Sequence, residues 1–165
     1  ACCASWTADT MSNLGNNASK GGSKSGIAVA QRKRARDLLV QALYQWQLGG
    51  ADAKDVEAEF RADNGRKTDW EFFHDALSYI AGHVAEVDQS FALYLDRDLK
   101  QLDPIETGIL RLGLYELGQR IDVPCRVVIN EYVDLAKKYG ASESHKFING
   151  VLDKAARKFR AIERA

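Results

Sequence analysis

Four cations stand within five residues near the start of an amphipathic segment, at Arg32, Lys33, Arg34 and Arg36. Arginine and lysine donate hydrogen bonds to phosphate oxygens, so this cluster could bind a nucleic-acid backbone. It occupies the first turn of a predicted helix, where the dipole is already positive and where Arg32 and Arg36 repel each other at i,i+4. Two interpretations stay equally open on this pattern: a solvated charge run at a frayed helix start, or an anion-binding surface.

A second group of polar side chains flanks an aromatic ring at the start of the last predicted helix: Glu143, Ser144, His145, Lys146 and Phe147. Helix N-termini offer free amides, and single-stranded RNA is bound by donors for phosphates and base edges beside a ring for stacking. The alternative is ordinary capping by Ser142 with Phe147 in the core, and the local pattern alone favours it. Gly150 is costly inside a helix, and one interpretation is close packing against a neighbouring helix.

Sites for catalysis are not indicated by the remaining residues. The sequence contains no GxSxG, P-loop, GxGxxG or HExxH motif. The histidines, at positions 74, 83 and 145, are too far apart to form a local metal motif. Paired carboxylates such as Asp96 and Asp98 are interpreted as solvated charge. We therefore predict that the protein is not an enzyme and uses no metal or cofactor.

Charge is distributed unevenly along a chain whose formal net charge is zero. Residues 52–106 contain 14 acidic and 6 basic side chains, whereas residues 31–51 carry a net charge of +3 and residues 107–165 a net charge of +4. Neutrality is thus a cancellation between basic and acidic regions. Two partners of opposite charge are as plausible as none.

The N-terminal residues differ in composition from the rest. Residues 1–30 are predicted to form a disordered tail, because residues 11–26 are rich in Asn, Ser, Gly and Lys. Residues 1–10 precede Met11, so an upstream or added extension is one interpretation. The three cysteines, Cys2, Cys3 and Cys125, lack the pattern of a disulfide framework. No apolar run is long enough to span a membrane, and we expect a cytoplasmic protein.

Helical periodicity dominates the rest of the chain, so the predicted fold class is all-α, a compact bundle of six or seven helices. Thr68 and Glu71 have capping-box spacing, and Asp103-Pro104 is typical of a helix start. Gly140 is predicted to end a helix in the left-handed conformation. The predicted helices cover residues 31–48, 53–61, 68–87, 91–95, 104–117, 125–139 and 143–162.

Several segments, in order and over residues 32 to about 160, resemble the NusB family of bacterial transcription antitermination factors. The matching segments are Arg32-Lys33-Arg34-Ala35-Arg36, Gln41-Ala42-Leu43-Tyr44-Gln45-Trp46-Gln47-Leu48, Leu114-Tyr115-Glu116-Leu117, Asp122-Val123-Pro124, Ile129-Asn130-Glu131 and the run from Leu135 to Lys154. Residues 51–101 match less well. The resemblance implies that residues 31–165 form an all-helical RNA-binding domain of two small helical subdomains.

The resemblance implies a protein without catalytic activity that binds boxA RNA together with NusE, a protein of the small ribosomal subunit. This pair would help the transcribing RNA polymerase complex to read through terminators, chiefly on ribosomal RNA operons. By position, the RNA-binding residues are Arg32, Lys33, Arg34 and Arg36, followed by Glu143, Ser144, His145, Lys146 and Phe147. Lys33 and Glu143 depart from the family pattern, and lysine lacks the bidentate geometry of arginine.

Other readings stay open at this point. NusB-like domains also occur in ribosomal RNA cytosine methyltransferases, and a helical adaptor could use its cations to bind an acidic protein. NusE, expected to be basic, is placed on the acidic region of residues 52–106. The protein is a monomer or a homodimer.

Overall fold

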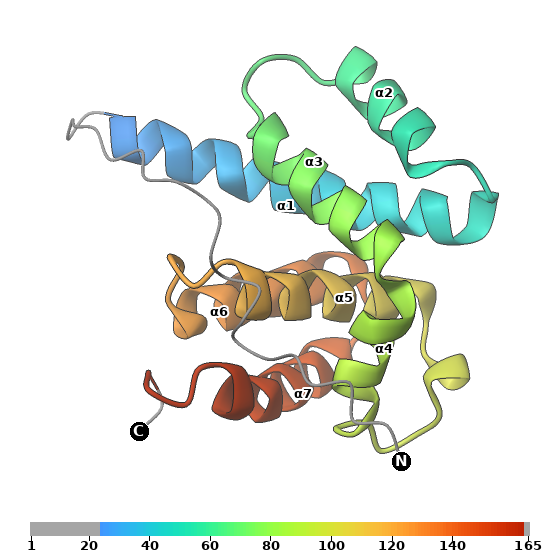
Figure 1. Ribbon diagram of the computed structural model, residues 1–165, viewed down its shortest axis with the longest axis vertical. Helices are drawn as coiled ribbons and strands as arrows, with labels where there is room; N and C mark the ends of the chain where they lie inside the picture. The colour runs from blue at the N-terminus through green and yellow to red at the C-terminus, as the bar shows by residue number, and fades with distance from the viewer. Residues whose placement is uncertain (1–23, 164–165) are drawn as a thin grey trace.

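The computed structural model describes residues 24–163, and these form seven α-helices and one 3-10 turn, as Figure 1 shows. The prediction of an all-α fold is confirmed. The elements are α1 (Lys24–Gly49), α2 (Ala53–Asp63), α3 (Trp70–Gly82), α4 (Val84–Ala92), η2 (Leu99–Gln101), α5 (Pro104–Gln119), α6 (Cys125–Tyr139) and α7 (Ser144–Phe159).

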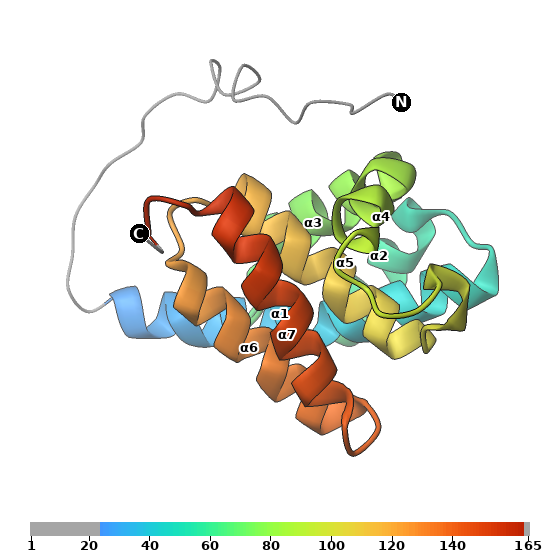
Figure 2. The ribbon, with the colours of Figure 1, turned by 90° about the horizontal axis from the view of Figure 1, so that it is seen from below.

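The helices pack in two groups. Helices α1, α2 and α3 contact one another on one side, α5, α6 and α7 contact one another on the other, and α1 lies against α5 between them (Figures 1 and 2). Helix α4 packs on α5. Large fully buried side chains from both groups, among them Leu39, Phe73, Leu110 and Tyr132, belong to one continuous core. The site-bearing helices α1, α6 and α7 are therefore held by a common core.

Helix α1 begins earlier than the sequence indicated. Residues 1–23 of the predicted disordered tail lie outside the described residues, but residues 24–30 are helical, so the boundary at residue 31 is wrong. No proline interrupts this stretch, and extending an existing helix by a turn costs far less than nucleating one. The predicted apolar face is confirmed: Ala35, Leu38, Leu39, Ala42 and Leu43 are buried.

The predicted helix over residues 68–87 is divided in two. Helix α3 ends at Gly82, and His83, with φ −132° and ψ 30°, separates it from α4. The His83 ring stacks on Tyr79, with centroids 4.4 Å apart, and its Nδ1 lies 2.9 Å from the Tyr79 carbonyl oxygen. Glycine is a poor helix former, so the break falls where the helix is weakest.

Capping confirms one prediction and corrects three. Asp103 accepts from the Ile105 amide at 2.7 Å and Pro104 opens α5, as predicted. The cap of α3 is Asp69 rather than Thr68, and α7 begins at Ser144 after Glu143 rather than with a Ser142 cap. Gly140 has φ −86°, not a left-handed value. Its role is steric, because an added Cβ would lie 2.8 Å from the Ser144 Cβ.

Arg160, directly after α7, forms hydrogen bonds to the end of α5. Its buried guanidinium donates to the carbonyl oxygens of Leu117 at 2.7 Å, Arg120 at 2.7 Å and Val123 at 3.0 Å. It also pairs with Glu163, which accepts from the Cys125 amide at the start of α6 at 2.7 Å. One side chain thus satisfies carbonyls that the end of α5 leaves without helical partners.

Candidate nucleic-acid interface

Three of the four predicted α1 cations reach the molecular surface. Lys33 and Arg34 are exposed, and Arg32 is half-buried. Arg32 Nε donates to Asp69 Oδ2 at 2.7 Å, and Arg34 Nε donates to Thr68 Oγ1 at 3.2 Å. The cations thus lie about two turns inside α1 and not in its first turn, and the segment between α2 and α3 supplies partners for two of them.

Arg36 does not lie on that surface. It is 4% exposed, and its Nε and Nη2 donate to the Glu116 carboxylate on α5 at 2.9 and 2.5 Å. Burial opposes its charge, but the hydrogen bond to Glu116 raises the pKa of Arg36 above its ordinary value. Arg36 was predicted to bind RNA with the other three cations, but its side chain lies in the core and is not available at the surface.

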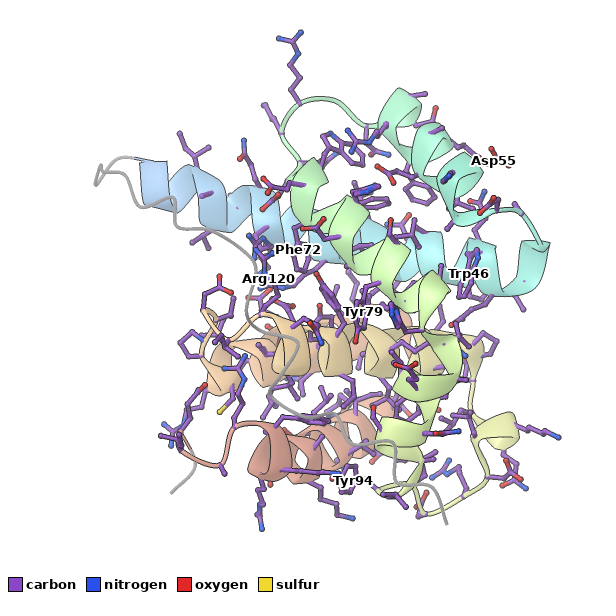
Figure 3. The ribbon with its side chains drawn as sticks, viewed as in Figure 1. Trp46, Asp55, Phe72, Tyr79, Tyr94 and Arg120 are labelled. Carbon is purple, nitrogen blue, oxygen red and sulfur yellow. The ribbon has the colours of Figure 1, made fainter. Side chains whose placement is uncertain are left out.

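The predicted repulsion between Arg32 and Arg36 is offset by a shared ring and separate counterions. Their guanidinium carbons lie 4.4 and 5.8 Å from the centre of the Phe72 ring, and that of Arg120 lies 5.7 Å from it. Figure 3 shows Phe72 and Arg120 between α1 and α5. A ring face attracts cations, and Asp69 and Glu116 pair with Arg32 and Arg36 respectively.

Lys33 lies on the side of α1 that faces the end of α6. Residues i, i+4 and i+8 follow one side of a helix, which places Lys33 in line with Asp37 and Gln41. Asp37 Oδ1 accepts from Lys138 Nζ at 2.6 Å, and Gln41 Nε2 donates to the Tyr139 hydroxyl at 2.9 Å. In the described part of the chain, Lys33 itself has no hydrogen bond or ion pair.

Lys138 was not among the site residues predicted from the sequence, but it lies next to α1. The hydrogen bond to Asp37 raises the pKa of Lys138, so this side chain is charged at neutral pH. Its Nζ lies 4.9 Å from the centre of the Tyr139 ring. The available signal was a pair of lysines in the last turn of α6, but only the packing of α6 on α1 decides which of them faces the cation cluster.

The second predicted group lies beyond the end of α6 and is divided between surface and core. Ser144 is buried and donates to Glu106 Oε1 at 2.7 Å, so its hydroxyl is occupied inside the protein. His145 is half-buried, whereas Glu143 and Lys146 are exposed and paired at 2.8 Å. The outward-facing donor of this group is Lys146.

Phe147 combines the two alternatives that the sequence left open. Its ring is half-buried and packs against the core, and the guanidinium carbon of Arg97 lies 4.7 Å from its centre. A base stacking on the exposed part of this ring would meet Arg97, itself a planar cation that stacks on bases.

The structure connects the two predicted regions through the end of α6. The contacts of Asp37 with Lys138 and of Gln41 with Tyr139 join α1 to α6. A short turn leads from the end of α6 to the start of α7, as Figure 2 shows. We call Lys33, Lys138 and Lys146 the cationic strip. Arg36 and Ser144 are not part of it.

An open apolar groove of about 630 Å³ adjoins this strip and lies among α1, α2, α5 and α6. Tyr44 and Leu48 of α1 are exposed there, and Phe60 of α2 and Ile105 of α5 complete the apolar lining. Such a surface beside a charged strip is suited to a protein partner.

Residues 24–163, the described range, contain neither a metal-binding cluster nor a membrane span. No group of three or more His, Cys, Asp or Glu residues there could hold a metal ion. No helix in that range is long and apolar enough to cross a membrane.

The fold and the surface place the protein in the class of small all-α proteins. It has two groups of helices and an exposed cationic strip. Comparison with known proteins then gives the family. The NusB family matches residues 33–157, and the chain belongs to this family.

Individual relatives are similar over most of their length. A transcription antitermination protein NusB from Alcanivorax borkumensis is 51% identical over 133 residues, which cover 80% of this chain and 89% of that protein. One from Marinobacter nauticus is 44% identical and covers 93% of this chain and 98% of its own length.

Solved structures agree with the fold. T. maritima NusB is 30% identical, with a TM-score of 0.70 over 77% of this chain and 91% of that one. A crystal structure of antitermination factors NusB and NusE in complex with double-stranded RNA contains a chain that is 31% identical, with a TM-score of 0.67 over 76% of this chain and 96% of that one.

Proposed function

We propose that this protein is a transcription antitermination factor that binds boxA-type RNA together with NusE and promotes read-through, chiefly on ribosomal RNA operons. The observation that carries the proposal is the similarity to relatives named as antitermination proteins, together with the solved NusB and NusE complex with RNA. The protein acts by binding and not by catalysis, within the transcribing RNA polymerase complex in the bacterial cytoplasm.

The RNA-binding surface is the exposed part of the predicted site. Lys33, Arg34 and Lys146 contact phosphates, while Phe147 and His145 contact bases. Arg32 supports this surface through Asp69, and Glu143 holds Lys146. Arg36 and Ser144 act indirectly, by fixing α1 and α7 in place.

NusE is placed on the acidic region, at α2 and the adjoining apolar groove. Asp55, Glu59 and Asp63 of α2 are exposed, and Gln45 of α1 donates to Glu59 at 2.7 Å at the edge of the groove. A basic ribosomal protein would find carboxylates for its charge and apolar surface for burial.

The deciding experiment measures the affinity of the protein for a short single-stranded boxA-type RNA, a scrambled RNA and a duplex, each with and without NusE. We expect preference for boxA, tighter binding with NusE, and weakening by Lys33→Gln with no loss of helicity. The matched control is Lys158→Gln, an exposed lysine at the other end of α7. Equal binding of boxA and scrambled RNA would contradict the proposal.

The same measurement separates the other readings. A module of the methyltransferase type would bind RNA without enhancement by NusE, and a protein adaptor would bind no RNA. The protein is expected to bind RNA as a monomer, which sedimentation with and without RNA would check.

A further inference from the structure

We propose that Lys138 is an additional phosphate-binding residue of the RNA surface, and that Asp37 competes with RNA for it. The inference rests on the proposed function and identifies a residue pair that tunes it. Lys138 comes from the end of α6, outside both regions that the sequence singled out.

Lys138 lies at the end of α6 and contacts α1. Its Nζ reaches across to Asp37 Oδ1 at 2.6 Å, and Asp37 lies one helical turn beyond Lys33 on the same side of α1. The chain runs on from Lys138 to the start of α7 and Lys146. Lys138 therefore connects the α1 region to the α7 region, and the inference is that an extended RNA backbone bound by both would also contact Lys138.

The ion pair between Lys138 and Asp37 is accessible to solvent. The Lys138 side chain is 57% exposed and that of Asp37 is 28% exposed. An ion pair in contact with water holds its partners weakly and is screened by salt. A phosphate can therefore replace the carboxylate. The Lys138 ammonium then still donates a hydrogen bond to a negatively charged oxygen.

Asp37 places a negative charge next to Lys138. Asp37 is the carboxylate beside Lys33 on this side of α1, and in the absence of RNA it neutralises the charge of Lys138. Removing its charge should strengthen RNA binding through Lys138. The adjacent Tyr139, held by Gln41 at 2.9 Å and lying under the Lys138 ammonium at 4.9 Å, keeps this end of α6 in place.

Lys137 provides a matched control within the same helix turn. Its side chain is also 57% exposed, but its Nζ lies 4.0 Å from Asp134 and it pairs within α6 rather than with α1. The substitutions Lys137→Gln and Lys138→Gln remove the same charge from the same helix. A general effect of net charge on RNA binding would therefore be equal in both.

The test titrates boxA-type RNA against the full chain over a range of salt concentrations. Lys138→Gln should weaken binding about threefold at ~0.1 M salt and reduce the slope of log K against log salt by ~0.7, the value for one phosphate of a single strand. Asp37→Asn should tighten binding by a similar factor, and this gain should vanish when Lys138→Gln is also present. Thermal unfolding checks that all variants fold.

Equal effects of Lys137→Gln and Lys138→Gln would overturn the inference, and so would an Asp37→Asn gain that persists without Lys138. In both cases the unaltered protein still binds boxA RNA and responds to Lys33→Gln, so the proposed function stands. If the unaltered protein binds no RNA, both proposals fail.

Discussion

Arg36 and Glu116 form a buried, bidentate ion pair between α1 and α5. The Tyr132 hydroxyl of α6 donates a hydrogen bond to the same carboxylate at 2.6 Å. Glu116 and Tyr132 have no exposed surface. Burial, with the nearby Glu116 charge, raises the pKa of Tyr132 well above its usual range, so its proton stays in place as a donor. The three side chains connect the helices of both groups at one point.

Removing Arg36 should destabilise the protein strongly. Arg36→Ala leaves the Glu116 charge buried without its partner, a change that costs about 3–5 kcal/mol of unfolding free energy. Chemical denaturation followed by circular dichroism measures the loss. Lys33→Ala, an exposed control on the same helix, should change stability by less than ~0.5 kcal/mol. A similar small effect for Arg36→Ala would show that the pair adds nothing.

The sequence predicted the helices well because large apolar residues recur at helical spacing, as in α1, and because Asp103-Pro104 is a strong local start signal. It did not predict the burial of Arg36, whose partner lies 80 residues away on α5. One signal was available: Leu39 and Leu43 follow Arg36 at i+3 and i+7, so it shares their buried face.

Which of the candidate site residues reach the surface could be predicted only in part, for the same reason. Exposed cations can be recognised from their charge, but the choice between Lys137 and Lys138 depends on how α6 meets α1. Ser144 was likewise predicted to be a surface donor. Its acceptor, Glu106 on α5, lies 38 residues earlier, so the local sequence did not indicate that the hydroxyl is occupied inside the protein. Pairing between distant helices is not visible in local periodicity.

Two glycines of the α6 and α7 region should respond in opposite ways to alanine. A Cβ at Gly140 would lie 2.7 Å from the Ala136 carbonyl oxygen and 2.8 Å from the Ser144 Cβ, so Gly140→Ala should cost about 1–3 kcal/mol. A Cβ at Gly150 meets nothing within 4 Å. The interpretation of Gly150 as a close-packing residue is therefore wrong, and Gly150→Ala should stabilise by about 0.5–1 kcal/mol. Thermal unfolding of both variants compares them directly.

Arg160 should be irreplaceable by lysine. Arg160→Ala leaves several buried carbonyl oxygens at the end of α5 without donors, which should cost about 3 kcal/mol. A lysine ammonium keeps the charge but cannot reproduce the planar fork that reaches Leu117, Arg120 and Val123 together. Denaturant titrations should place Arg160→Lys near Arg160→Ala. Stability close to that of the unaltered protein would show that charge alone suffices.

Asp69 should make stability sensitive to acid. Burial favours its neutral form, but hydrogen bonds from the Phe72 amide and Arg32 outweigh burial and lower the pKa of Asp69. A carboxylate with a lowered pKa stabilises the folded state above its unfolded pKa of about 3.9, and this contribution is lost as pH falls through the folded pKa. The stability gap between the unaltered protein and Asp69→Asn should thus be large at about pH 7 and shrink towards about pH 3. Asp63→Asn, at an exposed carboxylate, is the control, and a gap independent of pH would exclude this role.

Phe147 should contribute to RNA sequence preference more than to ionic affinity. Phe147→Leu preserves apolar contact with the core but removes the ring on which a base can stack, an interaction worth about 1–3 kcal/mol per base. The ratio of boxA to scrambled affinity should fall, while the salt dependence stays unchanged because no cation is lost. Arg97→Gln removes the cation above the ring and should weaken both RNAs and reduce the salt dependence. If Phe147→Leu folds normally, as judged by its melting temperature, and keeps the full boxA preference, then the ring serves only to pack α7 against the core.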